Sequence, residues 1–336
     1  METRPLDPYD DAQMRRFHEI AWRAEKDDGR PWNPMWTCTE MAGRFRATAS
    51  DRRTTGVAVY DGEQPDRMVG VGWIDMSLQD NLQTGWLFVA VEPELRGRGI
   101  GAVALGGLLD VARKNGRTQL VTGAGIPFDG RDDHPILRWA KRQGFTLANM
   151  EVQRNLELPV DDALLDEIAA GAAEKHGDYE IVTCVGPLPD ELLPSWCAHV
   201  NQFLVEAPLG EVEAEPEQST PETVREHDLE HEKVGRTVYH AVALKEGVVV
   251  ANSDLGVSAE AGDEAHQWGT LVHRDHRGHR LGAAVKVANL RLLQERQPGV
   301  PRIVTTNAET NQWMVAINER LGFQKVAVVP VLKRLL

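Results

Sequence analysis

Two arginine-glycine turns occupy equivalent places in the two halves of the 336-residue sequence. The first is the stretch ELRGRGIG at residues 94–101, and the second is DHRGHRLG at residues 275–282. Each turn follows strand-forming residues and precedes a stretch rich in alanine, leucine and valine that is typical of a helix. Arg96 and Arg277 lie 181 positions apart (277 − 96), as do the glycines that close the turns. This shared offset predicts a domain-sized internal repeat.

The glycines and arginines of these turns favour the binding of a phosphate group. The first backbone N–H groups of a helix have no partner within the helix, so they attract anions. Glycine at positions 97, 99 and 101 allows the backbone to form a concave nest without a Cβ atom in the way. Arg96 and Arg98 can add charge-assisted hydrogen bonds to phosphate oxygens. The turn therefore predicts a pyrophosphate site, and the alternative is a tight turn with solvated arginines.

Three families of phosphate-binding loop compete for this pattern. A nucleotide-triphosphate loop requires Lys-Ser or Lys-Thr after its glycines, and neither pair follows here. A dinucleotide-binding loop requires an acidic residue at the end of the next strand. That strand, expected over residues 118–122, ends at Thr122 without a carboxylate. The third pattern is Gln/Arg-x-x-Gly-x-Gly/Ala of the GNAT superfamily of acyl-CoA N-acyltransferases, which Arg96-x-x-Gly99-x-Gly101 resembles at every position.

The resemblance implies a fold, a co-substrate and a set of contacts. Each half is expected to have an α/β fold, a twisted mixed sheet with helices on both faces, so the chain would hold two tandem GNAT folds. The implied co-substrate is acetyl-CoA, and no metal is implied. The implied contacts in the first half are Val89, Val91, Arg96, Gly97, Arg98, Gly99, Ile100 and Gly101. Those in the second half are Leu271, Val272, Arg277, Gly278, His279, Arg280, Leu281 and Gly282.

The second copy departs from the motif at one position. Arg280 stands where the motif has its first glycine, so either Arg280 is an extra phosphate ligand or this turn holds the cofactor poorly. Downstream, residues 307–323 resemble the family segment in which an asparagine opens a helix beside the pantetheine arm and Leu-Gly-Phe closes it. This resemblance implies that Asn307 and Asn311 contact the cofactor. We therefore expect one active and one degenerate site.

The family's usual general acid is missing from both halves. In the family, a tyrosine five residues before the phenylalanine of the Gly-Phe pair often protonates the departing thiolate. Those positions are Ala140 and Asn318 in this chain. Another side chain, a water molecule or release of the thiolate must replace this tyrosine if the protein is a catalyst.

The base candidates lie on the strands beside the turns. Glu264 and His266 point to one face of their strand because side chains alternate with a period of two, and Asp254 is expected on the neighbouring strand. Such residues are also typical of a solvated sheet edge. In the first half, Asp75 and Glu92 are similar candidates, as is Asp80.

Acidic residues are concentrated in the second half of the sequence. Residues 157–230 contain 19 acidic and 2 basic residues, within a chain whose net charge is −14. In the family, the loop between the first two helices of a domain borders the acceptor groove, and this loop corresponds to residues 206–217, with five glutamates. Acidic walls attract a cationic amine and disfavour nucleic acid. The expected partner is a small cationic amine, and the alternative is a solubilising surface.

Cysteine usage and hydropathy predict the compartment. The three cysteines form no CxxC pair, which is typical of a reduced cytoplasm. Residues 1–7 lack the apolar core of a signal peptide, and no apolar run approaches the ~18 residues of a membrane span. We therefore expect a cytoplasmic protein without a membrane segment.

These observations predict the organisation and function of the chain. We expect an N-terminal domain at 1–156, a connecting helix within 157–178 and a C-terminal domain at 179–336, with helices over 190–204 and 220–233. The tandem layout is also similar to that of the mycothiol synthases. The predicted function is acetyl transfer from acetyl-CoA to a primary amine by direct attack. The alternatives are a non-catalytic acyl-CoA binding or sensing protein and a pair of structural domains without a ligand.

Overall fold

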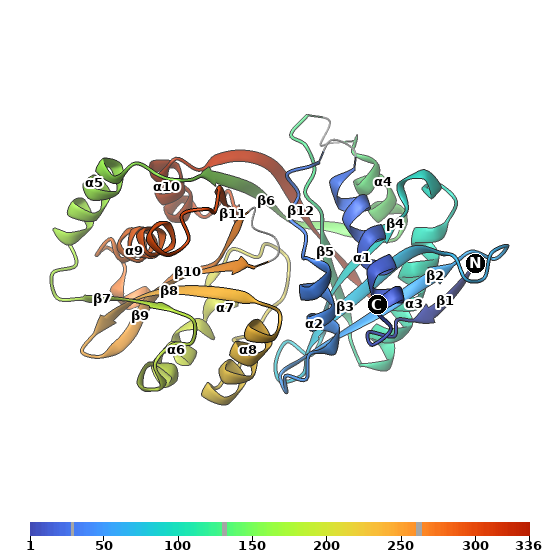
Figure 1. Cartoon of the computed structure of the whole chain (residues 1–336), viewed down its shortest axis with the longest axis horizontal. Helices are drawn as coiled ribbons and strands as arrows, with labels where there is room; N and C mark the ends of the chain where they lie inside the picture. The colour runs from blue at the N-terminus through green and yellow to red at the C-terminus, as the bar shows by residue number, and fades with distance from the viewer. Residues whose placement is uncertain (28–29, 130–132, 260–263) are drawn as a thin grey trace. The chain divides into compact units, whose positions relative to one another are not determined.

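The chain forms two compact units, which are described separately below. The computed structural model describes residues 1–27, 30–129, 133–259 and 264–336. The first unit contains Met1–Glu151, Leu209–Glu213 and Ala327–Leu336, and the second contains Val152–Pro208 and Ala214–Val326 (Figure 1). These units differ from the expected ranges 1–156, 157–178 and 179–336, because the end of the chain and a short acidic segment pack in the first unit.

The first unit is built on a mixed sheet with the strand order β1-β2-β3-β4-β5-β12. Its pairs are antiparallel except for β4 and β5, which are parallel. The strands are β1 (Glu2–Pro5), β2 (Arg52–Tyr60), β3 (Met68–Ser77), β4 (Thr84–Val91), β5 (Gln119–Gly123) and β12 (Gln324–Leu335). Two strands belong partly to each unit: β12 begins in the second unit, and β6 (Thr146–Glu157) begins in the first.

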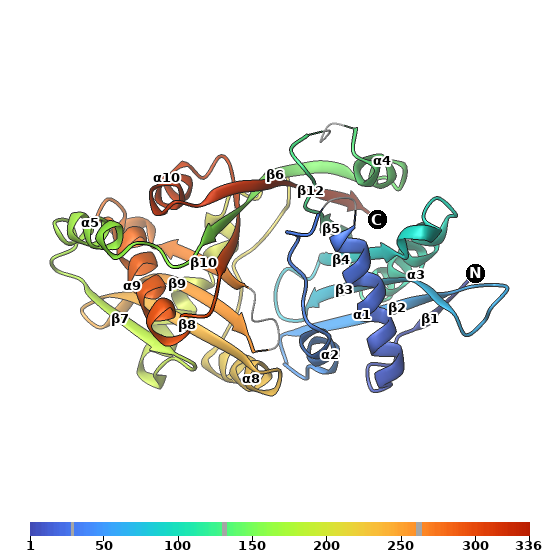
Figure 2. The ribbon, with the colours of Figure 1, turned by 45° about the horizontal axis from the view of Figure 1, so that its top comes forward.

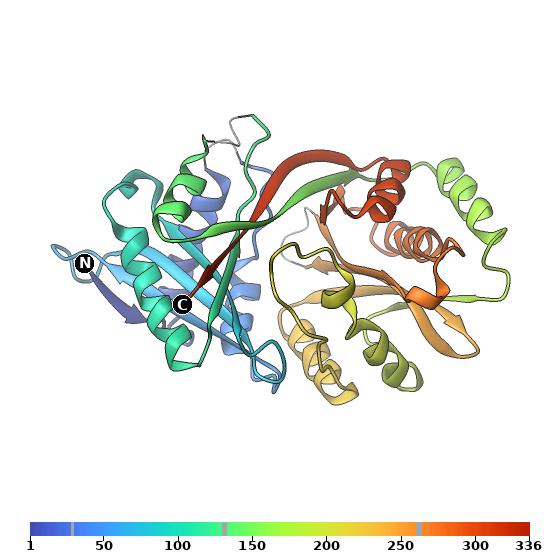
Figure 3. The same cartoon turned by 180° about the vertical axis from the view of Figure 1, so that it is seen from behind.

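Helices cover both faces of this sheet. They are α1 (Asp11–Lys26), α2 (Cys38–Arg46), α3 (Ile100–Lys114) and α4 (Pro135–Arg142). Along β2, Ala58 and Tyr60 pack in a cluster with α1, whereas Val57 and Val59 pack in clusters with α3. Because side chains alternate between faces along a strand, α1 and α3 lie on opposite faces. Figure 2 shows α1 across the sheet, and Figure 3 gives the view from behind.

Glycines in β3 allow α3 to lie close to the sheet. A Cβ atom added at Gly70 would lie 2.5 Å from Cγ2 of Ile100, and one at Gly72 would lie 2.9 Å from Cδ1 of Leu108. Ile100 and Leu108 are both buried. The absence of side chains at the two glycines therefore allows the close approach of α3, which begins at the end of the arginine-glycine turn.

The last strand of the chain returns to the first unit. β12 pairs antiparallel with β5, from Val331 opposite Gly123 to Leu335 opposite Gln119. Val212 of the acidic segment packs with Val121 and Ala148 in the same unit. Long-range pairing of this kind leaves no local signal in the sequence, which explains the difference from the expected domain ranges.

The second unit repeats the plan of the first. Its strand order is β6-β11-β10-β9-β8-β7; β10 and β11 pair in parallel, and β7, β8, β9 and β10 pair antiparallel in turn. The strands added here are β7 (Glu180–Val185), β8 (Arg236–Lys245), β9 (Val248–Ser258), β10 (Ala265–Val272) and β11 (Arg302–Ala308). The helices are α5 (Asp162–Ala173), α6 (Leu193–Val200), α7 (Phe203–Glu206), α8 (Pro221–Lys233), α9 (Leu281–Arg296) and α10 (Gln312–Leu321).

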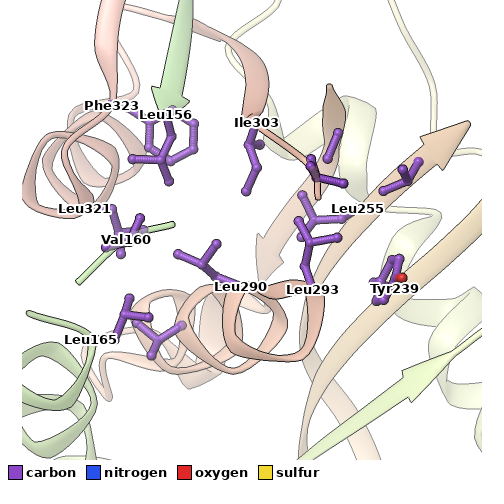
Figure 4. Close-up of a cluster of buried hydrophobic side chains, with 14 of the residues drawn as sticks. Leu156, Val160, Leu165, Tyr239, Leu255, Leu290, Leu293, Ile303, Leu321 and Phe323 are labelled. Carbon is purple, nitrogen blue, oxygen red and sulfur yellow. The ribbon is translucent and has the colours of Figure 1, made fainter. Parts of the chain in front are cut away.

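A buried cluster joins α5 to the core of the second unit. Leu165 of α5 packs with Leu290 and Leu293 of α9, and Leu321 and Phe323 close the cluster beside the end of α10 (Figure 4). Helix α5 is therefore part of the second unit. Among the residues that the structure describes, no helix combines the length and apolarity that crossing a membrane requires.

Candidate active site

In the first unit, strands β4 and β5 run parallel and then separate. Their pairing begins with Thr84 and Gln119 and ends with Trp86 and Val121, whereas β4 continues to Val91. A cavity of about 530 Å³ lies at this separation, lined by residues 87–91 of β4, the end of β5, the first turn of α3 and one side of α4. The separation provides a long, largely apolar slot beside an unpaired edge of β4.

The first arginine-glycine turn forms part of the lining of this cavity. Gly97 and Gly99 have left-handed φ angles of 79° and 84°, and Gly99 caps the N-terminus of α3. A Cβ atom at either glycine would meet nothing within 4 Å, so the turn is open toward a ligand. On the other side, a Cβ atom at Gly101 would lie 3.4 Å from the Trp139 ring of α4. The turn thus offers helix N–H groups to an anion in an unobstructed hollow.

The two arginines of this turn have different surroundings. Arg96 donates through Nη1 to Oδ2 of Asp27 (2.9 Å) and through Nη2 to the carbonyl of Ala24 (3.2 Å), so its guanidinium is tied to the end of α1. Arg98 is exposed. Val89, Val91 and Ile100, three of the implied contacts, line the same cavity.

A carboxylate that the sequence reasoning missed also lines the cavity. Glu25, in the last turn of α1, accepts a hydrogen bond from Nδ2 of Asn33 (2.6 Å). Burial raises the pKa of its carboxyl group, and the charges of Arg30, Arg96 and Lys26 oppose that increase. A signal was present in the sequence, because Glu25 lies 181 positions before Glu206, which belongs to the acidic loop.

The second turn keeps the backbone of the first. Gly278 has a φ of 86°, and Arg280, which stands in the place of Gly99, adopts the left-handed region with a φ of 55°. The Arg280 side chain donates through Nη1 to the carbonyl of Gly171 in α5 (2.5 Å). Nδ1 of His279 lies 3.1 Å from the carbonyl of Lys175, just beyond the same helix. This turn is therefore joined to α5 by its own side chains.

A glutamate forms ion pairs with Arg277 of the second turn and with Arg274, which directly precedes the turn. Glu206 of α7 accepts hydrogen bonds from Arg277 (2.7 Å) and from Nε of Arg274 (2.9 Å), and these bonds lower the pKa of its carboxyl group. Glu211, in the first unit, lies 3.5 Å from the Lys333 ammonium. The glutamates expected to border an acceptor groove are thus partly engaged in ion pairs.

The remaining implied contacts of the second unit all have structural partners. Leu271 and Leu281 are buried, and Val272 packs beside Leu281 in a cluster. A Cβ atom at Gly282 would lie 3.1 Å from Ile317. Asn307 accepts a hydrogen bond from Asn318 (2.7 Å), and Asn311 caps α10 by accepting from the amide of Met314 (3.3 Å).

The structure brings Glu264 and His266 together, as the strand period predicts. Their side chains are 3.9 Å apart, and buried Glu264 also accepts from Nε of Arg302 (3.3 Å). Glu264 immediately precedes β10 and His266 lies at its beginning, whereas the arginine-glycine turn follows the end of the strand. They are consequently separated from the turn by most of the length of a strand.

Asp254 lies in a buried hydrogen-bonded chain rather than on an open edge. It accepts from Nδ1 of His240 (2.6 Å) and from Nδ2 of Asn252 (2.5 Å), and Asn252 in turn bonds to Nε2 of His199 (3.1 Å). His199, His240, Asn252 and Asp254 are all buried. The arrangement explains how a carboxylate is accommodated in the interior of the unit.

The first-half base candidates are engaged by neighbouring side chains. Asp75 accepts from Arg44 (3.1 Å) and from the hydroxyl of Thr54 (2.6 Å). Glu92 accepts from Arg16 and Arg23, and Asp80 from Ser77 (3.0 Å). None of these three carboxylates lines the cavity. Within the described ranges, we also find no group of His, Cys, Asp and Glu residues arranged to hold a metal.

Comparison with known proteins identifies the class of the first unit. Residues 12–127 match the model of the acetyltransferase (GNAT) family. The matched segment contains the separated strands and the first turn. No curated protein matches the sequence.

The fold of the whole chain is shared with solved acetyltransferase structures, one of which is a tandem GNAT protein. A tandem GNAT protein from the clavulanic acid biosynthesis pathway is 24% identical, with a TM-score of 0.77 over 99% of this chain and 98% of that chain. A GCN5-related N-acetyltransferase from Sphaerobacter thermophilus is 14% identical, with a TM-score of 0.64 over 99% and 95%. A glucosamine N-acetyltransferase region of a fungal multi-domain GH3 β-N-acetylglucosaminidase is 17% identical, with a TM-score of 0.67 over 99% of this chain and 38% of that chain. The prediction of two tandem GNAT folds is confirmed.

Proposed function

We propose that the protein is an N-acetyltransferase that moves the acetyl group of acetyl-CoA to the primary amine of a small molecule. The observation that carries this proposal is the cavity between β4 and β5, which runs into the open turn at Gly97 and Gly99. The slot beside β4 suits the pantetheine arm, and the hollow of the turn suits the pyrophosphate. Acetyl-CoA supplies the activated thioester.

The reaction is a direct attack without a covalent enzyme intermediate. The neutral amine forms the N–C bond as the C–S bond breaks, and the electron pair of that bond leaves on the sulfur as the CoA thiolate. A base removes the proton that the nitrogen loses, and a backbone N–H of β4 stabilises the oxyanion. Ala140 supplies no acid at the position of the family's tyrosine, so the thiolate takes its proton from solvent.

We assign acetyl-CoA binding to the first unit and a structural role to the second. Two observations support this division. The second turn has an arginine, Arg280, where the first has Gly99, and that arginine is bonded to α5. The carboxylate of Glu206 already neutralises Arg274 and Arg277. The expected stoichiometry is one acetyl-CoA per chain.

The acceptor is a small molecule, and we keep a cationic amine as the first candidate on the net charge of −14. The ion pairs of Glu206 and Glu211 reduce the support that the acidic loop gave this preference. An amino sugar belongs among the candidates, because the name of the fungal neighbour includes a glucosamine N-acetyltransferase region. The proposed location is the cytoplasm.

A non-catalytic acyl-CoA binding protein is the second candidate function. The missing tyrosine at Ala140 favours it, since no side chain at that position can protonate the thiolate. This candidate requires saturable binding of acetyl-CoA without release of CoA in the presence of any amine.

Calorimetric titration with acetyl-CoA and a thiol assay for CoA release over a panel of amines test the proposal. Matched variants distinguish the two units. Gly97→Glu and Gly278→Glu place the same side chain at equivalent open positions with φ angles of 79° and 86°, so their backbone strain is similar. Gly97→Glu is expected to abolish binding and turnover, and Gly278→Glu to leave both unchanged. The reverse pattern would assign the active site to the second unit, and absence of binding by the natural protein would reject the acetyltransferase.

A further inference from the structure

The lining of the first-unit cavity contains one side chain that can accept a proton near neutral pH. Apart from Glu25, the described residues that line it are apolar, glycine, Thr122, Gln143 and three arginines. Arginine stays protonated, and neutral hydroxyl and amide groups are poor bases. Every acid that the sequence suggested for this half has its side chain engaged elsewhere. The cavity therefore singles out Glu25.

The carboxylate of Glu25 is held in place and yet is reachable from the cavity. The residue is half-buried at the end of α1, and Oε2 accepts from Nδ2 of Asn33 (2.6 Å). Asn33 is itself buried, and a Cβ atom at Gly125 would overlap its Oδ1 atom. The glycine thus leaves room for the asparagine that orients the carboxylate on the cavity wall.

Positively charged groups around Glu25 favour the ionised form of its carboxyl group. Arg30 is almost completely buried and donates to the carbonyls of Ala24 (2.6 Å) and Asp27 (3.1 Å). Arg96 donates to the same Ala24 carbonyl and to the Asp27 side chain. The charges of Arg30, Arg96 and Lys26 favour the carboxylate, whereas burial favours its protonated form and raises the pKa above the ordinary 4.5. A base with such a balance exchanges protons closer to neutral pH than an exposed glutamate does.

We propose that Glu25 is the proton acceptor for acetyl transfer in the first unit and that Asn33 is its positioning residue. This inference rests on the proposed function. When the amine attacks the thioester carbon, the N–C bond forms, the C–S bond breaks and its electron pair leaves on sulfur. The proton lost by the nitrogen passes to the carboxylate of Glu25, which returns it to solvent before the next turnover.

The second unit explains why its equivalent carboxylate cannot serve in this way. Glu206 lies 181 positions after Glu25 and, like it, in the last turn of a helix. There the carboxylate accepts hydrogen bonds from Arg277 of the turn and from Arg274, which directly precedes it, and those bonds lower its pKa. Glu25 of the first unit is therefore able to accept a proton, whereas Glu206 of the second unit stays ionised in its ion pairs.

The test compares Glu25→Gln and Glu25→Asp with the full-length natural protein. The probes are acetyl-CoA and the amine from the panel that releases CoA fastest. Glu25→Gln is expected to lower kcat/KM roughly 100- to 10,000-fold while the Kd of acetyl-CoA, measured by calorimetry, changes less than threefold. The acid limb of the pH profile is expected to disappear, and Glu25→Asp is expected to recover part of the rate. Glu19→Gln, at an exposed position of the same helix, is the matched control.

A second readout does not depend on turnover. Titration of 13C-labelled glutamate carboxyls by NMR, with Glu25→Gln used for assignment, is expected to show one carboxyl titrating clearly above pH 4.5. Unchanged kcat/KM in Glu25→Gln, or an ordinary titration of this carboxyl, would overturn the inference. A loss of acetyl-CoA affinity with unchanged kcat would make Glu25 a binding residue instead. If the natural protein binds acetyl-CoA but acetylates no amine, the proposed function fails and the inference with it.

Discussion

Arg280 adopts in the second turn the left-handed backbone conformation that Gly99 adopts in the first, with φ angles of 55° and 84°. The two turns therefore share a backbone shape that only one of them forms without strain. A left-handed conformation costs a non-glycine residue roughly 1–2 kcal/mol. In the second unit, the hydrogen bond from Arg280 to the carbonyl of Gly171 partly offsets that cost. In the first unit, Gly99 has no side chain, so the hollow of the turn is open.

Gly99→Arg transfers the second-unit residue to the first. We expect the free energy of unfolding to fall by about 1 kcal/mol because of backbone strain, and the Kd of acetyl-CoA to rise more than tenfold because the new side chain extends from an open hollow. Urea unfolding and calorimetry measure the two effects. Gly106→Arg is the control, since this glycine lies within α3 with nothing within 4 Å of its Cβ position. Equal affinities of Gly99→Arg and the natural protein would contradict the assignment of the turn.

Lys286 predicts a pH-dependent stability of the second unit. This lysine of α9 is buried, its ammonium lies 3.0 Å from Oε1 of Gln267, and burial lowers its pKa to about 7. Because the unfolded chain has the ordinary value of 10.5, it binds more protons than the folded chain between pH 7 and 10.5. The stability therefore rises with pH across this window, and the cost of burying the charge is fully present below pH 7.

Lys286→Met is expected to remove this cost. The variant should exceed the natural protein in free energy of unfolding by about 2–4 kcal/mol at pH 6, and the difference should shrink as the pH approaches 10.5. Urea unfolding at several pH values measures it. The exposed Lys233→Met, at the end of α8, should show no such trend. A difference that stays constant with pH would indicate a packing effect instead of a charge effect.

Glu206→Gln is expected to weaken the second unit at neutral pH. The bonds from Arg274 and Arg277 hold the folded pKa of Glu206 below its unfolded value of 4.5. The stabilisation is therefore present above pH 4.5 and is lost as the pH falls through the folded pKa. We expect a loss of about 1 kcal/mol at pH 7, because the pair is near the surface. Urea unfolding at pH 7 and at pH 4 should show the smaller difference at pH 4, and Glu191→Gln at an exposed position provides the comparison.

The sequence predicted the fold and the first turn better than it predicted the contacts around them. The 181-residue offset and the motif at Arg96 located both turns, because glycine spacing is a local property of the chain. The expected helix over 190–204 is divided into α6 and α7. The break follows from Asn201, whose side chain bonds to the backbone of Ser219, 18 residues away. The spacing of hydrophobic residues along the sequence does not indicate such a long-range contact.

The same reason explains why the sequence did not single out Glu25 and could not show the surroundings of Asp254. Both are acidic residues without a motif, so only their surroundings distinguish them. Folding places Glu25 on the wall of a cavity, whereas it places Asp254 between His240 and Asn252 in the interior. A polar residue on a strand or helix is thus easy to nominate from the sequence, but its role depends on which side chains reach it from other elements.

Gly125→Ala tests how far the position of Asn33 controls the site. A Cβ atom at Gly125 would overlap Oδ1 of Asn33 and lie 3.0 Å from the ring of Trp32, so the asparagine must shift. Its bond to Glu25 would then lengthen or break, and the carboxylate would lose its orientation. We expect kcat to fall roughly tenfold, as is typical when a proton-transfer group is misplaced, with little change in the Kd of acetyl-CoA, because the turn at Gly97 and Gly99 is untouched. Gly106→Ala, which meets nothing within 4 Å, should leave both constants unchanged. If Gly125→Ala weakened acetyl-CoA binding without slowing the reaction, the contact between Asn33 and Glu25 would matter for the cofactor rather than for the proton.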